Sequence, residues 1–349
     1  MGQLGRPPKT FTRQQFEELQ KEVEHCYIAS GRVYAVPLEQ LMHPGGNEIL
    51  DEHKGQDITK LFEGGEGGHA HSKSAHLLLE QYYQGDLVGE DGATPAGGGE
   101  SELQRILRVQ ASAQQSVVDE SKPLLNQVMK LDPATYVSWI AVPSTGHPHM
   151  FDTQLMERLT SAPWWTVPLL WLPIASAMLY YAHTKCGAGL PLLAALFPIG
   201  ILVWQLFEYC VHRFAFHFDP KTPEAIKLHF LMHGHHHKYP MDFDRLVFPP
   251  APAILVAGLW YLLLWSLCSS ERVLYGLMAG GIVGYVMYDT THYALHRVHK
   301  GLLAAVVGHA LKTSHMWHHY ENEQEGFGIS SRLYDFVFST LPKRKQHAM

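Results

Sequence analysis

The 349-residue chain carries 24 histidines, and ten of those in its second half have the spacing of metal ligands. The i,i+4 spacing of His292 and His296 places both rings on one helical face, and an HxxHH grouping lets one helical turn present three imidazoles to neighbouring metals. The ten form four groups: His212 and His217; His233, His236 and His237; His292 and His296; His315, His318 and His319. Ten imidazoles exceed what one metal ion accepts, so the sequence predicts two ions.

The type of ligand leaves the metal open, because imidazole suits zinc, iron, copper and nickel. The four cysteines lie far apart without CxxC spacing, which argues against a zinc-thiolate site. Because ten neutral ligands leave two cations uncompensated, Glu208 and Asp289 are predicted to accept hydrogen bonds from imidazole N–H groups. A carboxylate that reaches a membrane interface is the alternative role of each. His229 and His235 are further candidates for hydrogen bonds to the ligand rings.

A second pair of histidines lies in the first quarter of the chain, within an HPGG segment at 43–46 and a His-Ser pair at 71–72. Two axial imidazoles, His43 and His71, can hold a haem iron, with His69 as the other candidate for the second position. A six-coordinate iron leaves no site for a substrate, so this module is expected to transfer electrons only. Zinc lacks redox chemistry and cannot accept electrons from a haem module. The module therefore favours iron at the site of the ten histidines.

Charge and composition differ between the first quarter of the chain and the rest. Residues 1–90 hold 8 Lys+Arg and 14 Asp+Glu, which accounts for the whole net charge of −6, and the remainder is balanced at 19 against 19. Neither part has the basic face that nucleic-acid binding requires. Residues 10–89 are predicted to form a small α+β domain, with a capping box at Thr12 and Gln15 and a hairpin turning at Ser30 and Gly31. Residues 90–121 are glycine-rich and predict a flexible linker with a short amphipathic helix.

Residues 122–349 are predicted to form an all-α integral membrane domain. Long stretches without charged residues indicate four transmembrane helices, at about 164–183, 190–211, 246–268 and 273–293. The segments 212–245 and 296–349 carry five and seven Lys+Arg, whereas the two short connections on the other side carry two in all. The positive-inside rule then places both termini and a histidine-rich helical cap in the cytosol. The thiols of Cys186 and Cys268, near the opposite face, are expected to stay free.

Several motifs carry a resemblance to known families. The HPGG segment, His71-Ser72, GQD at 55–57 and GDL at 85–87 resemble the cytochrome b5 family over residues 10–89. The histidine pattern is shared by membrane desaturases, sterol oxidases and alkane or carotenoid hydroxylases. Four further motifs narrow the choice among these families: KPLL at 122–125, RLVFPP at 245–250, GFGIS at 326–330 and LYD at 333–335. With them, residues 10–342 resemble the fatty acid 2-hydroxylase family.

That resemblance implies hydroxylation of long-chain fatty acids, free or acyl-linked, at carbon 2 with O2, for sphingolipid synthesis at the endoplasmic reticulum membrane. Electrons would come from an NAD(P)H-dependent cytochrome reductase through haem b on His43 and His71. The ten histidines would hold two iron ions, and zinc fits the same nitrogen sites. The candidates for holding the substrate head group, or for anchoring at the membrane interface, are Arg213, Lys238, Arg245 and Tyr293. The rival activities are a desaturase, a sterol or sphingoid-base hydroxylase, and a non-enzymatic, membrane-tethered b5 electron donor.

Overall fold

The computed structural model describes residues 9–37, 43, 47–65, 71, 73–89, 117–144, 146–298 and 307–343. The chain separates into two compact units: Met1–Asp119 with Ser138–Ser144, and Glu120–Val137 with Thr145–Met349. His69, most of the predicted linker at 90–121 and its amphipathic helix lie outside the described residues.

The N-terminal unit is a small α+β fold, as predicted. Its four-stranded sheet has the order β1-β4-β3-β2, with β1 and β4 parallel and the other pairs antiparallel. The strands are β1 (Thr10–Phe11), β2 (Cys26–Ala29), β3 (Arg32–Ala35) and β4 (Tyr83–Leu87). The helices are α1 (Arg13–Glu22), α2 (Glu48–Glu52), α3 (Thr59–Phe62) and α4 (Lys73–Glu80). Phe16 of α1 is fully buried against the sheet and closes its core.

Local sequence signals account for the start of this unit. The Thr12 amide donates to Gln15 Oε1 at 2.9 Å and the Gln15 amide donates to Thr12 Oγ1 at 3.3 Å, so the predicted capping box is formed. Ser30 and Gly31 have φ values of 51° and 72° between β2 and β3. A two-residue hairpin turn of this kind requires positive φ at both positions, which confirms the predicted turn.

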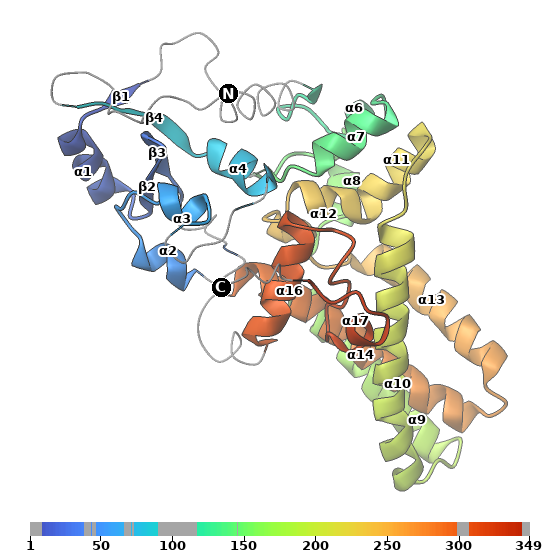
Figure 1. Ribbon diagram of the computed structural model, residues 1–349. Coiled ribbons are helices and arrows are strands. Elements are labelled where there is room, and N and C mark those ends of the chain that lie inside the picture. The colour runs from blue at the N-terminus through green and yellow to red at the C-terminus, as the bar shows by residue number, and fades with distance from the viewer. Residues whose placement is uncertain are drawn as a thin grey trace. The chain divides into compact units, whose positions relative to one another are not determined.

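The C-terminal unit is almost wholly helical (Figure 1). Its long helices are α9 (Thr166–Thr184), α10 (Leu190–Cys210), α13 (Pro250–Leu267) and α14 (Glu271–Arg297). Shorter helices are α6 (Leu125–Val128), α7 (Pro133–Ile140, whose end from Ser138 belongs to the N-terminal unit), α8 (Gln154–Leu159), α11 (Pro223–His229), α12 (His235–Lys238), α16 (His309–Tyr320) and α17 (Leu333–Val337). Two π-helical segments, η2 (Val211–Phe216) and η3 (Phe230–Gly234), and a 3₁₀ turn, η4 (Phe243–Arg245), complete it.

Each of the four predicted transmembrane segments forms one long helix. Within the described residues, two continuous helical stretches are long and apolar enough to cross a membrane, at Leu190–Phe216 and Phe243–Leu267. Helix α14 continues beyond the predicted span, through Arg297, as the i,i+4 spacing of His292 and His296 predicted. This extension keeps His292 and His296 in one regular helix. The thiols of Cys186 and Cys268 are free, as expected, and so are those of Cys26 and Cys210.

The bundle depends on a close crossing of α10 and α14 at two glycines. A Cβ atom at Gly200 would lie 2.3 Å from the backbone oxygen of Leu277, and one at Gly280 would lie 2.1 Å from that of Phe197. Both distances are far below van der Waals contact, so a side chain at either position would push the helices apart. The crossing fixes α14, which carries His292, against α10, which leads directly into the π-helical segment that carries His212.

Candidate metal centre

The ten histidines predicted as metal ligands lie together in the C-terminal unit, in two sets of five. In each set the five nitrogen atoms that face one another lie within 4.8 Å. The first histidine group is His212, His217, His233, His237 and His318. The second histidine group is His236, His292, His296, His315 and His319.

Helical geometry explains how the sequence neighbours divide between the groups. Three pairs with i,i+4 spacing stay together, because residues four apart share a helix face. Adjacent residues point about 100° apart on a helix with 3.6 residues per turn. His236 and His237 therefore enter different groups, and so do His318 and His319. Each adjacent pair lies between the two groups and links them.

The pair at 212 and 217 needs a different backbone. Residues five apart do not share a face of an α-helix, but i→i+5 hydrogen bonding in a π-helix stacks them. The chain is π-helical from Val211 to Phe216, directly after α10, and the ring centroids of His212 and His217 lie 5.1 Å apart. The five-residue spacing was the available signal for this π-helix, which the sequence analysis missed.

The nitrogens of each group converge on one small volume. In the first group, His233 Nε2 lies 3.0 Å from the Nε2 atoms of both His212 and His237. In the second group, His236 Nε2 lies 2.9 Å from the Nε2 atoms of both His292 and His319. This convergence of ring nitrogens is the arrangement that a shared cation requires.

Backbone carbonyls fix the tautomers of three of these rings. His212 Nδ1 donates to the oxygen of Phe327 at 2.6 Å, His318 Nδ1 to that of Glu325 at 2.9 Å, and His292 Nδ1 to that of Leu246 at 3.2 Å. A carbonyl only accepts, so each Nδ1 holds the proton and each Nε2 presents its lone pair to the group. Neutral imidazoles aligned in this way fit a metal ion.

The expected role of Glu208 and Asp289 was wrong, because among the described residues both carboxylates accept from backbone amides and neither is hydrogen-bonded to a ligand ring. Glu208 Oε1 accepts from the amides of Ile329 and Ser330, at 3.0 and 2.7 Å, and thereby holds the 326–330 loop that supplies Phe327 O. Asp289 accepts from the amide of Phe248 at 3.1 to 3.2 Å. Phe248 belongs to the segment that supplies Leu246 O.

A third carboxylate, Asp335 of α17, also holds the 326–330 loop. Its two oxygens accept from the amides of Phe327 and Gly328, each at 2.9 Å. Sequence reasoning did not single it out, although it lies in the quoted LYD motif. The GFGIS, LYD and RLVFPP motifs are therefore the loops and anchors that orient the ligand rings.

Burial keeps the cap histidines neutral. It lowers the pKa of His217 and, in the second group, of His236, His315 and His319, and the neighbouring rings lower these pKa values further. Every ligand ring except His217 is buried. Within the described residues, His217 Nε2 and His318 Nε2 have no hydrogen-bond partner. Neutral rings with buried lone pairs fit metal ions as ligands, and protons do not compete for them near neutral pH.

His229 and His235, the two histidines considered as partners of the ligand rings, lie against other side chains, and among the described residues His235 Nε2 has no hydrogen-bond partner. His229 Nδ1 lies 2.7 Å from Tyr136 Oη, and His235 Nε2 lies 3.4 Å from Asp242 Oδ2. Burial lowers the pKa of each to about 4. Within the described residues, neither ring is hydrogen-bonded to a ligand ring.

The four candidates for holding the substrate head group have different surroundings. Arg245 pairs with Glu157 and with Asp242, so its charge is already compensated. Arg213 donates to Tyr209 Oη at 2.9 Å, and Tyr293 stacks on Trp164. Lys238 is buried, and burial lowers its pKa to about 8.

The N-terminal unit brings the predicted haem ligands together. The ring centroids of His43 and His71 lie 5.9 Å apart. His71 Nδ1 donates to the oxygen of Phe62 at 3.0 Å, which places the lone pair on Nε2, and the Phe62 ring stacks on His71 with centroids 4.1 Å apart. Two imidazoles at this separation, beside an aromatic ring, fit the axial ligation of a haem.

Comparisons with known proteins cover both units. The cytochrome b5-like heme/steroid binding domain family matches residues 12–88, and the fatty acid hydroxylase family matches residues 197–340. The chain is 37% identical to the fatty acid 2-hydroxylase of Macaca fascicularis and 36% identical to that of Homo sapiens, each over 356 residues and 92% of both chains. It is 34% identical, over 355 residues and 90% of both chains, to a ceramide very long chain fatty acid hydroxylase of Saccharomyces cerevisiae.

A solved structure resembles the C-terminal unit. The hydroxylase domain visible in full-length scs7p matches with a TM-score of 0.61 and 36% identity, over 67% of this chain and 89% of that one. The match therefore extends from the sequence to the fold of the domain that carries both histidine groups.

Proposed function

Because the chain belongs to the fatty acid 2-hydroxylase family, we propose that it is a membrane di-iron monooxygenase that hydroxylates carbon 2 of long-chain fatty acids. The substrate is a free or acyl-linked fatty acid, and the product supplies 2-hydroxy acids to sphingolipids, in line with the ceramide hydroxylases among its relatives. The observation that carries the proposal is the convergence of ten imidazoles in two groups of five.

Each histidine group would hold one iron ion, and the bound pair would supply the redox chemistry that O2 needs to react with a C–H bond. Burial keeps the ligand rings neutral, and the backbone carbonyls of Phe327, Leu246 and Glu325 orient three of these rings. An unreactive methylene offers no functional group to recognise. The protein must therefore select carbon 2 by holding the carboxyl end near the metals.

The electrons would arrive one at a time through the N-terminal unit. His43 and His71 would hold haem b as axial ligands, and a six-coordinate haem transfers electrons without binding substrate. An NAD(P)H-dependent cytochrome reductase would reduce it. In domain terms, residues 10–89 form the haem domain, 90–121 the linker and 122–349 the hydroxylase domain.

The C-terminal unit would cross the endoplasmic reticulum membrane four times, through α9, α10, α13 and α14. Helix α14 has 27 residues, which gives a length of about 40 Å at 1.5 Å per residue, against a hydrocarbon core of about 30 Å. The surplus at its C-terminal end carries His292 and His296 out of the hydrocarbon. The positive-inside rule puts this end, with both termini, in the cytosol.

A pair of variants on one helix tests the proposal. His318 and His309 both lie on α16, but His318 is a buried member of the first group and His309 is exposed. His318→Ala should abolish 2-hydroxy acid formation and lower the iron content, while the haem absorption spectrum stays unchanged. His309→Ala should keep product, iron and haem.

The result also separates the rival activities. Product formation that survives His318→Ala would remove the di-iron assignment and leave the b5 unit as an electron donor. A double bond, or a hydroxyl on a sterol or sphingoid base, would identify a related enzyme instead, and mass spectrometry of the products distinguishes each from a 2-hydroxy acid.

A further inference from the structure

Helix α17 buries its acidic residue and exposes its apolar ones. Asp335 is fully buried, and its carboxylate accepts from two backbone amides of the 326–330 loop. On the outer side, Phe336 is 72% exposed, Val337 55% and Leu333 43%. A helix on a water-facing surface has the opposite arrangement, with its polar residues outward and its apolar residues against the core. A cluster of exposed apolar side chains of this kind marks a surface that binds an apolar partner.

Helix α17 lies beside the C-terminal part of α10 (Figure 1). Tyr334 Oη donates to the backbone oxygen of Leu202 at 3.1 Å, and the Phe338 ring stacks on Tyr209 with centroids 5.1 Å apart. Leu202 comes eight residues before the end of α10 at Cys210, which is about 12 Å along the axis at 1.5 Å per residue. The contacts of α17 therefore lie along α10 itself, well before the end of this apolar helix.

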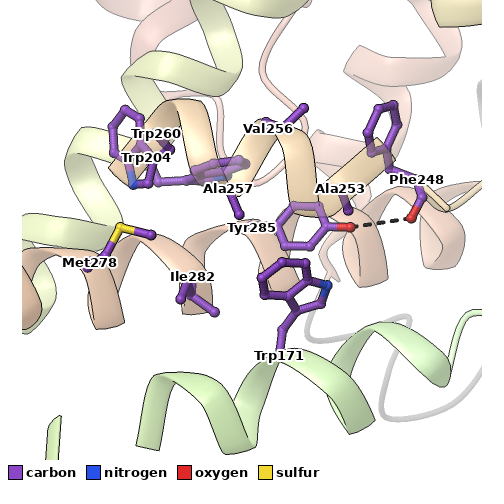
Figure 2. Close-up of a pocket in the computed structure, with 10 residues that line it drawn as sticks. All are labelled: Trp171, Trp204, Phe248, Ala253, Val256, Ala257, Trp260, Met278, Ile282 and Tyr285. Carbon is purple, nitrogen blue, oxygen red and sulfur yellow. Dashed lines mark hydrogen bonds between the residues drawn. The ribbon is translucent and has the colours of Figure 1, made fainter. Parts of the chain in front are cut away.

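The face of α10 that points away from the bundle is also apolar. Trp204 points into the bundle, where its ring centroid lies 5.8 Å from that of Trp260 and 5.5 Å from that of Tyr285 (Figure 2). Residues two positions before and after Trp204 are turned about 200° from it, because each residue turns an α-helix by about 100°. These residues are Leu202 and Leu206, which are 46% and 37% exposed. Since α17 joins α10 at Leu202, the exposed apolar face of α10 continues onto α17.

The segment before α17 covers polar side chains of the same part of α10. Ser331 Oγ donates to Gln205 Oε1 at 3.0 Å, and Glu208 Oε1 accepts from the amides of Ile329 and Ser330. A polar group that faces acyl chains without a hydrogen bond is strongly unfavourable. This segment therefore supplies the hydrogen bonds that both side chains need if this part of α10 lies in a membrane.

We propose that α17 inserts into the cytosolic leaflet of the membrane beside α10, and that the acyl chains around it hold the 326–330 loop in place. The inference rests on the proposed function, in which α10 crosses the membrane. The partner is lipid rather than a second copy of the chain, because the apolar surface continues onto the outward face of a transmembrane helix. Basic residues flank α17 in the sequence, with Arg332 before it and Lys343, Arg344 and Lys345 after it, and they favour the anionic headgroups of that leaflet.

Insertion of α17 acts on the first histidine group through Asp335. Its carboxylate accepts from the amides of Phe327 and Gly328, and the oxygen of Phe327 orients His212 at 2.6 Å. Phe336 is the next residue of the same short helix, so a helix that leaves the membrane takes the carboxylate with it. Phe336 is therefore a positioning residue, which supports the metal ligand through the loop without touching it.

Photolabelling from the lipid tests the insertion without any variant. The full-length protein is reconstituted, one copy per disc, in nanodiscs whose phosphatidylcholine carries a diazirine in the middle of an acyl chain. After irradiation, mass spectrometry identifies the labelled peptides. We expect label on residues 333–338 as well as on the α10 peptide that contains Leu202 and Leu206. Ile49 of the N-terminal unit is an exposed apolar residue outside this surface, and its peptide should carry no label.

The labelling pattern separates failure of the inference from failure of the proposed function. Label on α10 without label on residues 333–338 would overturn the inference, because α17 would then lie outside the acyl chains. Label on neither segment would refute the membrane crossing of α10 and the inference with it. Wild-type protein that is labelled on both segments but forms no 2-hydroxy acid would refute the proposed activity and leave the insertion of α17 supported.

A polar residue on the outer side of α17 tests the link to the metal. Phe336→Gln adds no charge beside Asp335, and it should lower the label on residues 333–338 severalfold, because an amide is unfavourable among acyl chains. It should also release one of the two iron ions at a chelator concentration about tenfold lower than in the wild type. Phe336→Leu stays apolar and should match the wild type in both measurements, as should Ile49→Gln, the same kind of change on the other unit. Coincident release of both ions in Phe336→Gln, with normal haem content, would overturn the claim that lipid supports the first histidine group.

Discussion

Replacing Glu208 should release metal from the first histidine group before the second. Its carboxylate accepts from the backbone amides of Ile329 and Ser330 in a buried site. Glu208→Ala leaves both amides without an acceptor, at about 1–3 kcal/mol each, so the 326–330 loop loses about 2–6 kcal/mol. This loop supplies the carbonyl of Phe327 that orients His212, and loss of such an indirect partner typically weakens metal affinity about 10- to 100-fold.

The assay is iron content during titration of the purified full-length protein with a chelator. Wild-type protein should release its two ions together at high chelator, whereas Glu208→Ala should release one of them at a concentration about 10- to 100-fold lower. Glu208→Gln retains the amide-accepting oxygen and should shift release far less. Glu224→Ala, an exposed glutamate on α11, is the control. Coincident release of both ions in Glu208→Ala would refute the claim that this carboxylate serves one group only.

Two further changes test the fold. Gly280→Leu should lower the thermal unfolding midpoint and the yield of folded protein, because its Cβ would lie 2.1 Å from Phe197 O and overpacking costs about 1–3 kcal/mol. Gly258→Leu, with nothing within 4 Å of its Cβ, should not, and equal losses would disprove the close crossing. Burial lowers the pKa of His229 to about 4 in the folded protein, against about 6.5 in the unfolded chain. Between these two pH values the unfolded chain binds more protons at His229 than the folded protein does. The contribution of the neutral His229 ring to the free energy of unfolding is therefore complete above about pH 6.5 and falls by about 3 kcal/mol as the pH drops to about 4. His229→Gln should flatten the pH dependence of the unfolding midpoint over that window, and an unchanged slope would contradict this assignment.

Much of the local structure could be predicted because its cause is local. The capping box at Thr12 needs only Gln15 three residues later, and the β2–β3 turn needs only residues that tolerate positive φ. The four long helices follow from uncharged stretches of sufficient length. The ten candidate ligands were likewise visible from residue type and spacing.

The sequence by itself determined which imidazoles gather and that they outnumber the ligands of one ion, because helical periodicity decides which residues share a face. Only the tertiary structure decided how adjacent histidines such as His236 and His237 divide between the two groups. It also showed that carbonyls of distant loops, rather than Glu208 and Asp289, hold the rings. Every residue has a backbone carbonyl, so residue type does not reveal which carbonyl orients a ring. Its role is set only when packing brings a loop such as 326–330 against a helix more than a hundred residues away.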